Sequence, residues 1–141
     1  MPMTLTKPAI DLGIVTTNGD AMLAFYRDVL GLVYQGQIPM PVGGGVMHRM
    51  LCGDSLIKLV VVPQTGAAPA LKPAPATPGG IQGGAGYRYW TITVGNLGEM
   101  VKACADAGHP VVIPQREIRP GVSIAMVADP DGNWVEFLSL A

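Results

Sequence analysis

The sequence matches itself weakly when it is shifted by 78 residues, and this internal repeat constrains the fold more than any other feature. The segment 18–22 (NGDAM) falls on 96–100 (NLGEM). In the same way 53–59 (GDSLIKL) falls on 131–137 (DGNWVEF). The identities are few, so the argument for two copies of one structural unit depends on whether both halves also contain the same order of elements.

Both halves open with an alternating strand and continue with an amphipathic helix. We expect the strands at 9–15 and 88–94, where apolar and polar residues alternate. Asn96 is followed three residues later by Glu99, which resembles a capping box at the start of the second helix. Apolar residues recur at helical spacing at Met22, Phe25, Tyr26, Val29 and Leu30 in the first half, and at Leu97, Met100, Val101, Cys104 and Gly108 in the second.

The remainder of each half consists of short strands. Gly31 and Gly108 stand where helix C-termini favour a left-handed residue. Turn residues separate apolar alternations, a strong hairpin signal. We expect strands at 45–52 and 56–62 around Gly53-Asp54, and at 111–113, 123–128 and 133–139, with a turn at Pro130-Asp131-Gly132.

The order of these elements predicts an α+β fold of two βαβββ modules. The residues between the modules are rich in Pro, Ala and Gly and carry almost no charge, which is typical of a long loop. We predict one domain over residues 1–141, with module 1 at about 8–62, a linker loop at 63–86 and module 2 at about 87–141.

The chain is sparsely charged. It is 49% hydrophobic and 13% charged, and nine basic residues face ten acidic ones. This balance excludes a basic nucleic-acid footprint and a polybasic membrane patch, and no apolar run is long enough for a membrane helix. Cys52 and Cys104 have no metal-binding spacing and are expected to be reduced, as in a cytoplasmic protein. A low charge content favours an apolar pocket wall or a large buried interface.

Strand alternation places four residues on the faces that turn away from the helices. These are Asp11, Lys58, Tyr89 and Glu136, and the repeat makes Asp11 equivalent to Tyr89 and Lys58 equivalent to Glu136. If the modules pair side by side, these faces line a shared cleft, where charges must pair or contact a ligand. The faces toward the helices would carry Ile10, Leu12, Ile14, Ile57, Leu59, Val61, Trp90, Ile92, Val94, Val135 and Phe137.

Two segments resemble the signatures of the vicinal oxygen chelate superfamily, which includes glyoxalase I, bleomycin-resistance proteins, fosfomycin-resistance transferases and extradiol dioxygenases. They are 25–32 (FYRDVLGL) and 129–137 (DPDGNWVEF). The resemblance implies that the two βαβββ modules curl into an open, cup-shaped mixed β-sheet barrel with helices outside. It also implies a homodimer and a small-molecule ligand or substrate.

In metal-dependent members of that superfamily four strand positions hold a divalent metal, and the motifs align those positions with Asp11, Lys58, Tyr89 and Glu136. Lys58 is an ammonium with donors only, and a tyrosine with a pKa of about 10 is a poor ligand. We therefore expect no metal cofactor. The alternative is Zn, Ni, Fe or Mn held by Asp11 and Glu136.

Three functions remain open. The first is a glyoxalase- or bleomycin-resistance-like protein that binds an apolar or carbonyl-containing compound without metal. The second is a metal-independent isomerase, lyase or cyclase, in which Asp11 or Glu136 abstracts a proton and Lys58 with Tyr89 stabilises an enolate-like oxygen. The third is a divalent-metal-dependent lyase or dioxygenase.

Further residues are candidates for ligand binding. A two-residue turn at Gly53-Asp54 pairs Arg49 with Lys58, so Arg49 would face the cup and grip a carboxylate or phosphate. His48 would face the other way unless a bulge exchanged the two. Trp134 lies beside Glu136 and could stack on a planar ligand. The same strand faces add Val60, Thr91 and Thr93.

Overall fold

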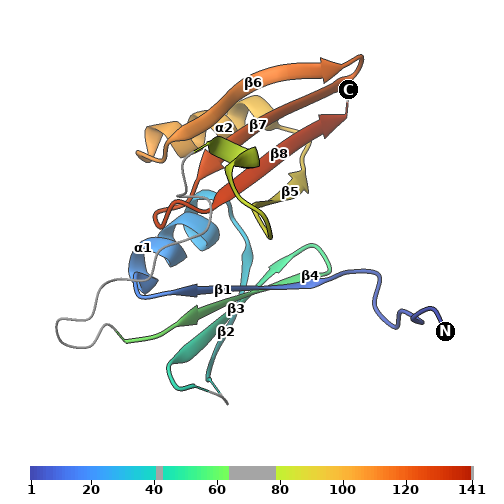
Figure 1. Cartoon of the computed structure of the whole chain (residues 1–141). Helices are drawn as coiled ribbons and strands as arrows, with labels where there is room; N and C mark the ends of the chain where they lie inside the picture. Colours follow the sequence, from blue (N-terminus) through green and yellow to red (C-terminus); the bar gives the residue numbers. More distant parts are fainter. Residues whose placement is uncertain (41–42, 64–78, 141) are drawn as a thin grey trace. The chain divides into compact units, whose positions relative to one another are not determined.

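The computed structural model describes residues 1–40, 43–63 and 79–140. Contacts between Cα atoms divide the chain into two compact units, Met1–Leu71 and Lys72–Ala141 (Figure 1). Each unit contains one of the predicted modules, whereas the prediction that both form a single domain stays a prediction. Within the described residues no helix is long and apolar enough to cross a membrane.

The first unit is a four-stranded mixed sheet with one helical segment. The sheet has the order β1-β4-β3-β2, in which β1 is parallel to β4 and the other pairs are antiparallel. Helix α1 continues directly into a π-helical segment. The elements are β1 (Asp11–Thr16), α1 (Gly19–Leu23), the π-helix (Ala24–Val29), β2 (Val33–Pro39), β3 (Val46–Cys52) and β4 (Ser55–Val61).

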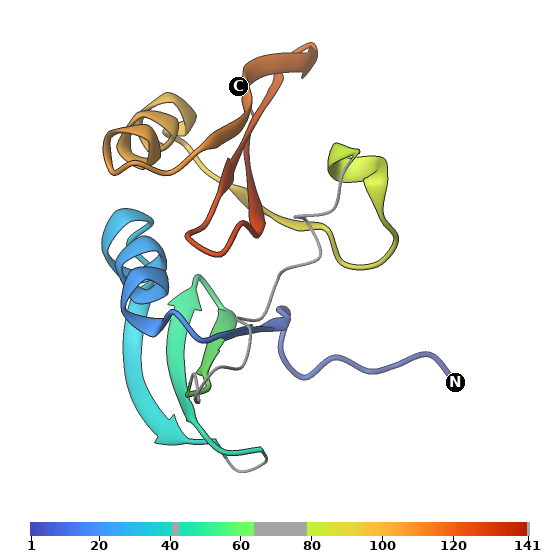
Figure 2. The same ribbon diagram turned by 60° about the vertical axis from the view of Figure 1, so that its left-hand side comes forward.

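The core of the first unit lies between this helical segment and one face of the sheet (Figures 1 and 2). Phe25 and Tyr26 are fully buried and pack edge to face, with ring centroids 4.8 Å apart. From the sheet, Ile57 and Leu59 are buried as the alternation predicts. Each such side chain contributes about 1.5–3 kcal/mol by leaving water.

The second unit repeats this plan. Its sheet has the order β5-β8-β7-β6, again with the first pair parallel. Helix α2 packs on β6, β7 and β8, and Leu97 and Cys104 are its buried residues. The elements are β5 (Tyr89–Thr93), α2 (Leu97–Asp106), β6 (Val111–Arg119), β7 (Val122–Ala128) and β8 (Trp134–Leu140), preceded by a 3-10 helix (Gly80–Gly83).

The structure confirms the α+β class, the two βαβββ modules and the repeat. In the parallel pairs Gly13 is opposite Lys58 in the first unit, and Thr91 is opposite Glu136 in the second. Gly13 and Thr91 are 78 residues apart, and so are Lys58 and Glu136. Helix α1 begins at residue 19 and α2 at residue 97, the same shift. The glycines expected after the helices, Gly31 and Gly108, have φ of 81° and 88°.

Several local predictions need correction. Strand β2 has no predicted counterpart, and β6 runs to Arg119 rather than ending at residue 113. Ile10 lies outside β1 and is 70% exposed, so it does not pack on the helix. The side chain of Asn96 makes no cap hydrogen bond; its amide donates to the Glu99 carboxylate at 3.5 Å.

The linker prediction falls only in part on described residues. Residues 64–78 lie outside them, whereas Gly80–Gly83 form a 3-10 helix where a loop was expected. Both cysteines are free, as predicted.

Candidate functional site

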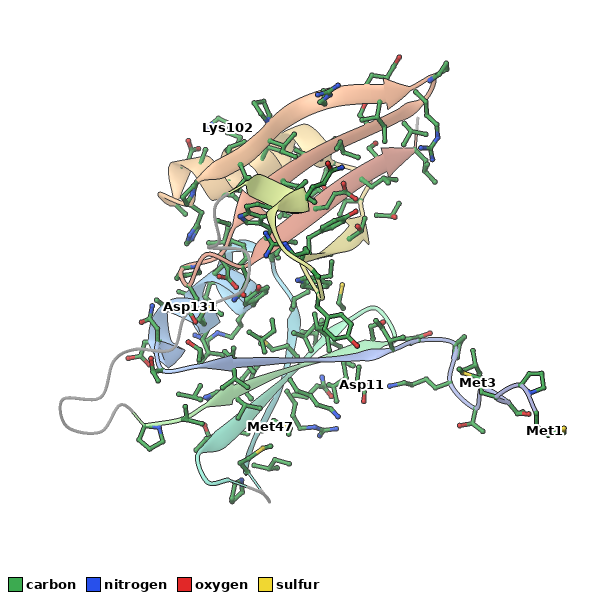
Figure 3. The ribbon with its side chains drawn as sticks, viewed as in Figure 1. Met1, Met3, Asp11, Met47, Lys102 and Asp131 are labelled. Carbon is green, nitrogen blue, oxygen red and sulfur yellow. The ribbon has the colours of Figure 1, made fainter. Side chains whose placement is uncertain are left out.

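One face of the first sheet turns away from α1, and its residues form three rows across the four strands. We call it the helix-free face, and in Figure 3 the side chains of Asp11 and Met47 lie on this side of the sheet. Reading from β1 to β2, the first row is Asp11, Leu56, Leu51 and Val33; the central row is Gly13, Lys58, Arg49 and Gly36; the third is Val15, Val60, Met47 and Ile38.

Asp11 and Lys58 come together on the helix-free face, as predicted. The Lys58 ammonium lies 3.5 Å from one oxygen of the Asp11 carboxylate. Lys7, which the sequence did not indicate, lies 2.6 Å from the other oxygen. The hydrogen bond from Lys7 is the main cause of a lowered Asp11 pKa, burial opposes it, and Lys58 adds to the lowering. Asp11 is therefore held as a carboxylate between two cations.

Arg49 lies directly opposite Lys58 in the antiparallel register of β3 and β4. The two-residue turn at Gly53-Asp54 is thus confirmed, because Cys52 pairs with Ser55. Like charges in directly opposed positions of two strands destabilise a sheet. Within the described residues Arg49 has no hydrogen bond or ion pair that would offset this repulsion.

His48 is on the other face of β3, opposite Leu59. Its Nδ1 shares a hydrogen bond of 2.8 Å with the Tyr34 hydroxyl, and the Arg27 guanidinium lies 5.6 Å from the Tyr34 ring. Burial, followed by the charge of Arg27, lowers the His48 pKa, whereas Asp20 opposes them. His48 therefore serves the packing of the helix side and does not share a face with Lys58.

In the second unit the structure brings Thr91 and Glu136 together. The Thr91 hydroxyl donates a hydrogen bond of 2.8 Å to the Glu136 carboxylate. Tyr89 and Thr93 lie on the same face of β5 as Thr91, and the Tyr89 side chain is 46% exposed. The Tyr89 and Glu136 positions thus share one sheet face, two residues apart along the parallel pair.

Trp134 has a partner that sequence reasoning missed. Arg88 is only 8% exposed, and its guanidinium lies 5.6 Å from the centroid of the Trp134 ring. The same guanidinium donates to the backbone carbonyls of Ile81 at 3.0 Å and Gly80 at 2.7 Å. Arg88 therefore ties the 3-10 helix to the start of β5. No local pattern signals this role, because the carbonyls belong to a segment without periodicity.

Asp129, at the start of the second signature motif, has a structural role. Its side chain is buried, and one carboxylate oxygen accepts the backbone N–H groups of Asp131 at 3.0 Å and Asn133 at 2.9 Å. The other oxygen accepts the Asn133 amide at 3.0 Å. Asp131, labelled in Figure 3, is in the turn that these bonds close. The motif thus fixes the β7–β8 turn and thereby the start of β8.

The four positions that the resemblance associates with a metal do not carry a matching donor set. In the first unit the Lys58 ammonium, which has no acceptor, lies beside the carboxylate of Asp11. In the second, Glu136 supplies a carboxylate, while Tyr89 is a poor ligand. Among the described residues no three His, Cys, Asp or Glu side chains gather in a way that could hold a metal ion. A transition metal wants about four ligands with nitrogen or sulfur among them.

Solved structures with the same fold are numerous. A glyoxalase family protein from Bacillus cereus has a TM-score of 0.76 at 18% identity, with 98% of this chain and 96% of that chain covered. A lactoylglutathione lyase from Agrobacterium tumefaciens scores 0.61 at 22% identity, covering 98% and 94%. An antibiotic binding protein from a Streptomyces species scores 0.67 at 15% identity, covering 100% and 99%. At these identities the likeness shows the fold alone.

No curated protein matches the chain. The family model described as the Glyoxalase/Bleomycin resistance protein/Dioxygenase superfamily matches residues 10–137. This match spans both units and includes both signature motifs. The chain therefore belongs to the Glyoxalase/Bleomycin resistance protein/Dioxygenase superfamily, in agreement with the resemblance of its sequence.

Proposed function

We propose that this protein binds an apolar or carbonyl-containing small molecule, and that its site works without a divalent metal. The observation that carries the proposal is the ion pair between Lys58 and Asp11, 3.5 Å apart, at positions where metal-dependent relatives would carry ligands. A protonated lysine repels a divalent cation and has no lone pair to donate. The partner carboxylate is already engaged by this lysine and by Lys7.

The apolar rows of the helix-free face favour a ligand with an apolar body. Val15, Val33 and Ile38 lie on this face and are 54%, 59% and 44% exposed. Val15 lies on one edge strand and Val33 and Ile38 on the other, while Leu56 and Val60 on the strand β4 are buried. The half-buried Met47 next to Ile38 extends the accessible apolar surface of the third row. The Streptomyces relative, described as an antibiotic binding protein, shows that this fold can serve binding.

Binding is favoured over acid–base catalysis by the state of Asp11. Its pKa lies below the ordinary value because Lys7 and then Lys58 stabilise the carboxylate. A carboxylate with a lowered pKa is a weaker general base, whereas proton abstraction next to a carbonyl needs a base with a pKa closer to neutrality. This part of the proposal predicts that Asp11→Asn lowers ligand affinity and changes no catalytic rate.

The metal part is tested by equilibrium dialysis of the purified chain against Ni²⁺, Zn²⁺ and Mn²⁺, followed by elemental analysis. We expect no stoichiometric metal on the wild type. The double variant Asp11→His/Lys58→Glu replaces the ammonium by a carboxylate and introduces a nitrogen ligand, so it should bind Ni²⁺ or Zn²⁺ more tightly than the wild type, whereas the control Lys102→Gln should not. Stoichiometric metal on the wild type that disappears in Glu136→Gln would contradict the proposal.

The binding part is tested with acetophenone, a small aromatic ketone, in an NMR titration. Shifts of the Val15, Met47 and Ile38 methyl signals are expected, because these are the accessible side chains of the apolar row beside Lys58. Shifts confined to the helix-facing methyls, such as those of Leu59, would place the ligand elsewhere.

The proposal also includes the expected homodimer. Sedimentation equilibrium tests it by comparing the measured mass with the chain mass of 14.7 kDa.

A further inference from the structure

The central row of the helix-free face joins two cations and two glycines. Across the sheet it reads Gly13, Lys58, Arg49 and Gly36. A Cβ atom added at Gly13 or at Gly36 would meet nothing within 4 Å. The two cations are therefore flanked on both sides by positions where the sheet has no side chain and open space above it.

Gly13 has no backbone reason to be glycine. Gly36 has a φ of 104° next to an irregularity in the register of β2, so a side chain there would be strained. Gly13 has no such positive φ and lies inside a regular parallel pair. A glycine within a strand weakens it and often marks a place where a ligand approaches closely. The equivalent residue in the second unit is Thr91, which carries a side chain at this position and donates a hydrogen bond to the Glu136 carboxylate.

The charges of this surface are not balanced. Lys7 and Lys58 both lie at the carboxylate of Asp11, and Arg49 stands opposite Lys58, so three cations and one carboxylate leave two positive charges in excess. Arg49 has no hydrogen bond or ion pair in the part of the chain that the structure describes. An anion between Arg49 and Lys58 would remove their repulsion and accept the guanidinium's paired donors.

We propose that Arg49 and Lys58 bind an oxyanion, a carboxylate or a phosphate, carried by the ligand, and that the ligand enters over Gly13 and Gly36. The inference rests on the proposed function and specifies its ligand class as an amphipathic anion. Leu56 and Val60, at the centres of the neighbouring rows, are buried, so the more accessible residues Val15, Met47 and Ile38 hold the apolar part of the ligand.

The test compares benzoate with acetophenone, which has nearly the same shape but no charge, by NMR titration or calorimetry. Benzoate should bind about tenfold or more tightly, since hydrogen bonds to charged groups are worth roughly twice neutral ones. Its affinity should fall as NaCl is added. Phenyl phosphate is then tested in place of benzoate. The probe with the higher affinity identifies the oxyanion, phosphate or carboxylate, that the site prefers.

Two kinds of variant locate the site. Arg49→Gln should abolish the preference for benzoate over acetophenone, whereas Lys102→Gln, an exposed lysine on α2, should leave it unchanged. Gly13→Val adds a side chain in open space to a strand conformation that valine favours, so the variant should fold and lose benzoate binding. Circular dichroism and the melting temperature verify that it is folded.

The outcomes separate this inference from the proposed function. Equal binding of benzoate and acetophenone, or unchanged benzoate binding by Arg49→Gln, overturns the oxyanion site and leaves the proposed function standing. No binding of either probe to the helix-free face overturns both. If Gly13→Val alters self-association in sedimentation experiments and not probe binding, the face is an interface between copies of the chain and the inference is wrong.

Discussion

Replacing Asp129 by alanine should destabilise the second unit strongly, because one buried carboxylate closes the β7–β8 turn. The side chain is 2% exposed and accepts three hydrogen bonds of 2.9–3.0 Å. A hydrogen bond to a charged group contributes about 1.5–3 kcal/mol. Neighbouring bonds are not additive, and water can replace part of what is lost at a turn. We therefore expect a loss of about 3 kcal/mol rather than the full sum.

This loss is measured by urea denaturation monitored by tryptophan fluorescence and far-UV circular dichroism. For a chain of this size about 3 kcal/mol corresponds to a fall in melting temperature of roughly 10 °C. The matched control is Asp54→Ala in the equivalent turn of the first unit, where the aspartate is exposed. It should change stability by less than about 0.5 kcal/mol. An Asp129→Ala midpoint equal to that of Asp54→Ala would refute the structural role of the motif.

Asp129→Asn gives a second readout of the same geometry. The amide oxygen can still accept the backbone N–H groups of Asp131 and Asn133, but its NH₂ group would face the Asn133 amide, which is also a donor. We expect a loss between those of the alanine variant and the wild type. A variant as unstable as Asp129→Ala would contradict the expectation that the amide oxygen still accepts the two backbone N–H groups.

Three further predictions concern other parts of the molecule. Lys7→Met should raise the Asp11 pKa toward its ordinary value, because Lys7 is the main cause of the lowering; carboxyl NMR titration measures it. Since the folded pKa is lowered, any stabilisation by this carboxylate is present at neutral pH and is lost as the pH falls through the lowered pKa. Burial raises the Cys104 pKa to about 11, so thiol reagents at pH 8 should label it only after unfolding. Phe25→Ala should cost about 3–5 kcal/mol, as for other buried aromatics, in a urea titration.

Much of the candidate site followed from local rules of strand geometry. Alternation alone assigns Asp11 and Lys58 to one face, because successive side chains of a strand point to opposite sides. The short turn at Gly53-Asp54 then fixes the register, which is why the pairing of Arg49 with Lys58 was predictable.

Strand β2 escaped prediction for a physical reason. Its register shifts between Tyr34 and Gly36, so the alternation that reveals a strand is interrupted in its middle. Strand β6 has three such irregularities and contains Pro114, which an edge strand tolerates because one side of it makes no ladder bonds. The partner of His48, Tyr34, was missed together with β2.

By itself the sequence determined the repeat, the α+β class, the family and the faces on which the polar strand residues lie. These properties depend on period and on local turns, which neighbouring residues encode. The tertiary structure decided which charges meet. It set the path of the irregular segments, which places Lys7 at Asp11, four residues away, and Arg88 at the carbonyls of Gly80 and Ile81, eight and seven residues away. Such contacts depend on where irregular segments run in space, which no periodic pattern in the chain records.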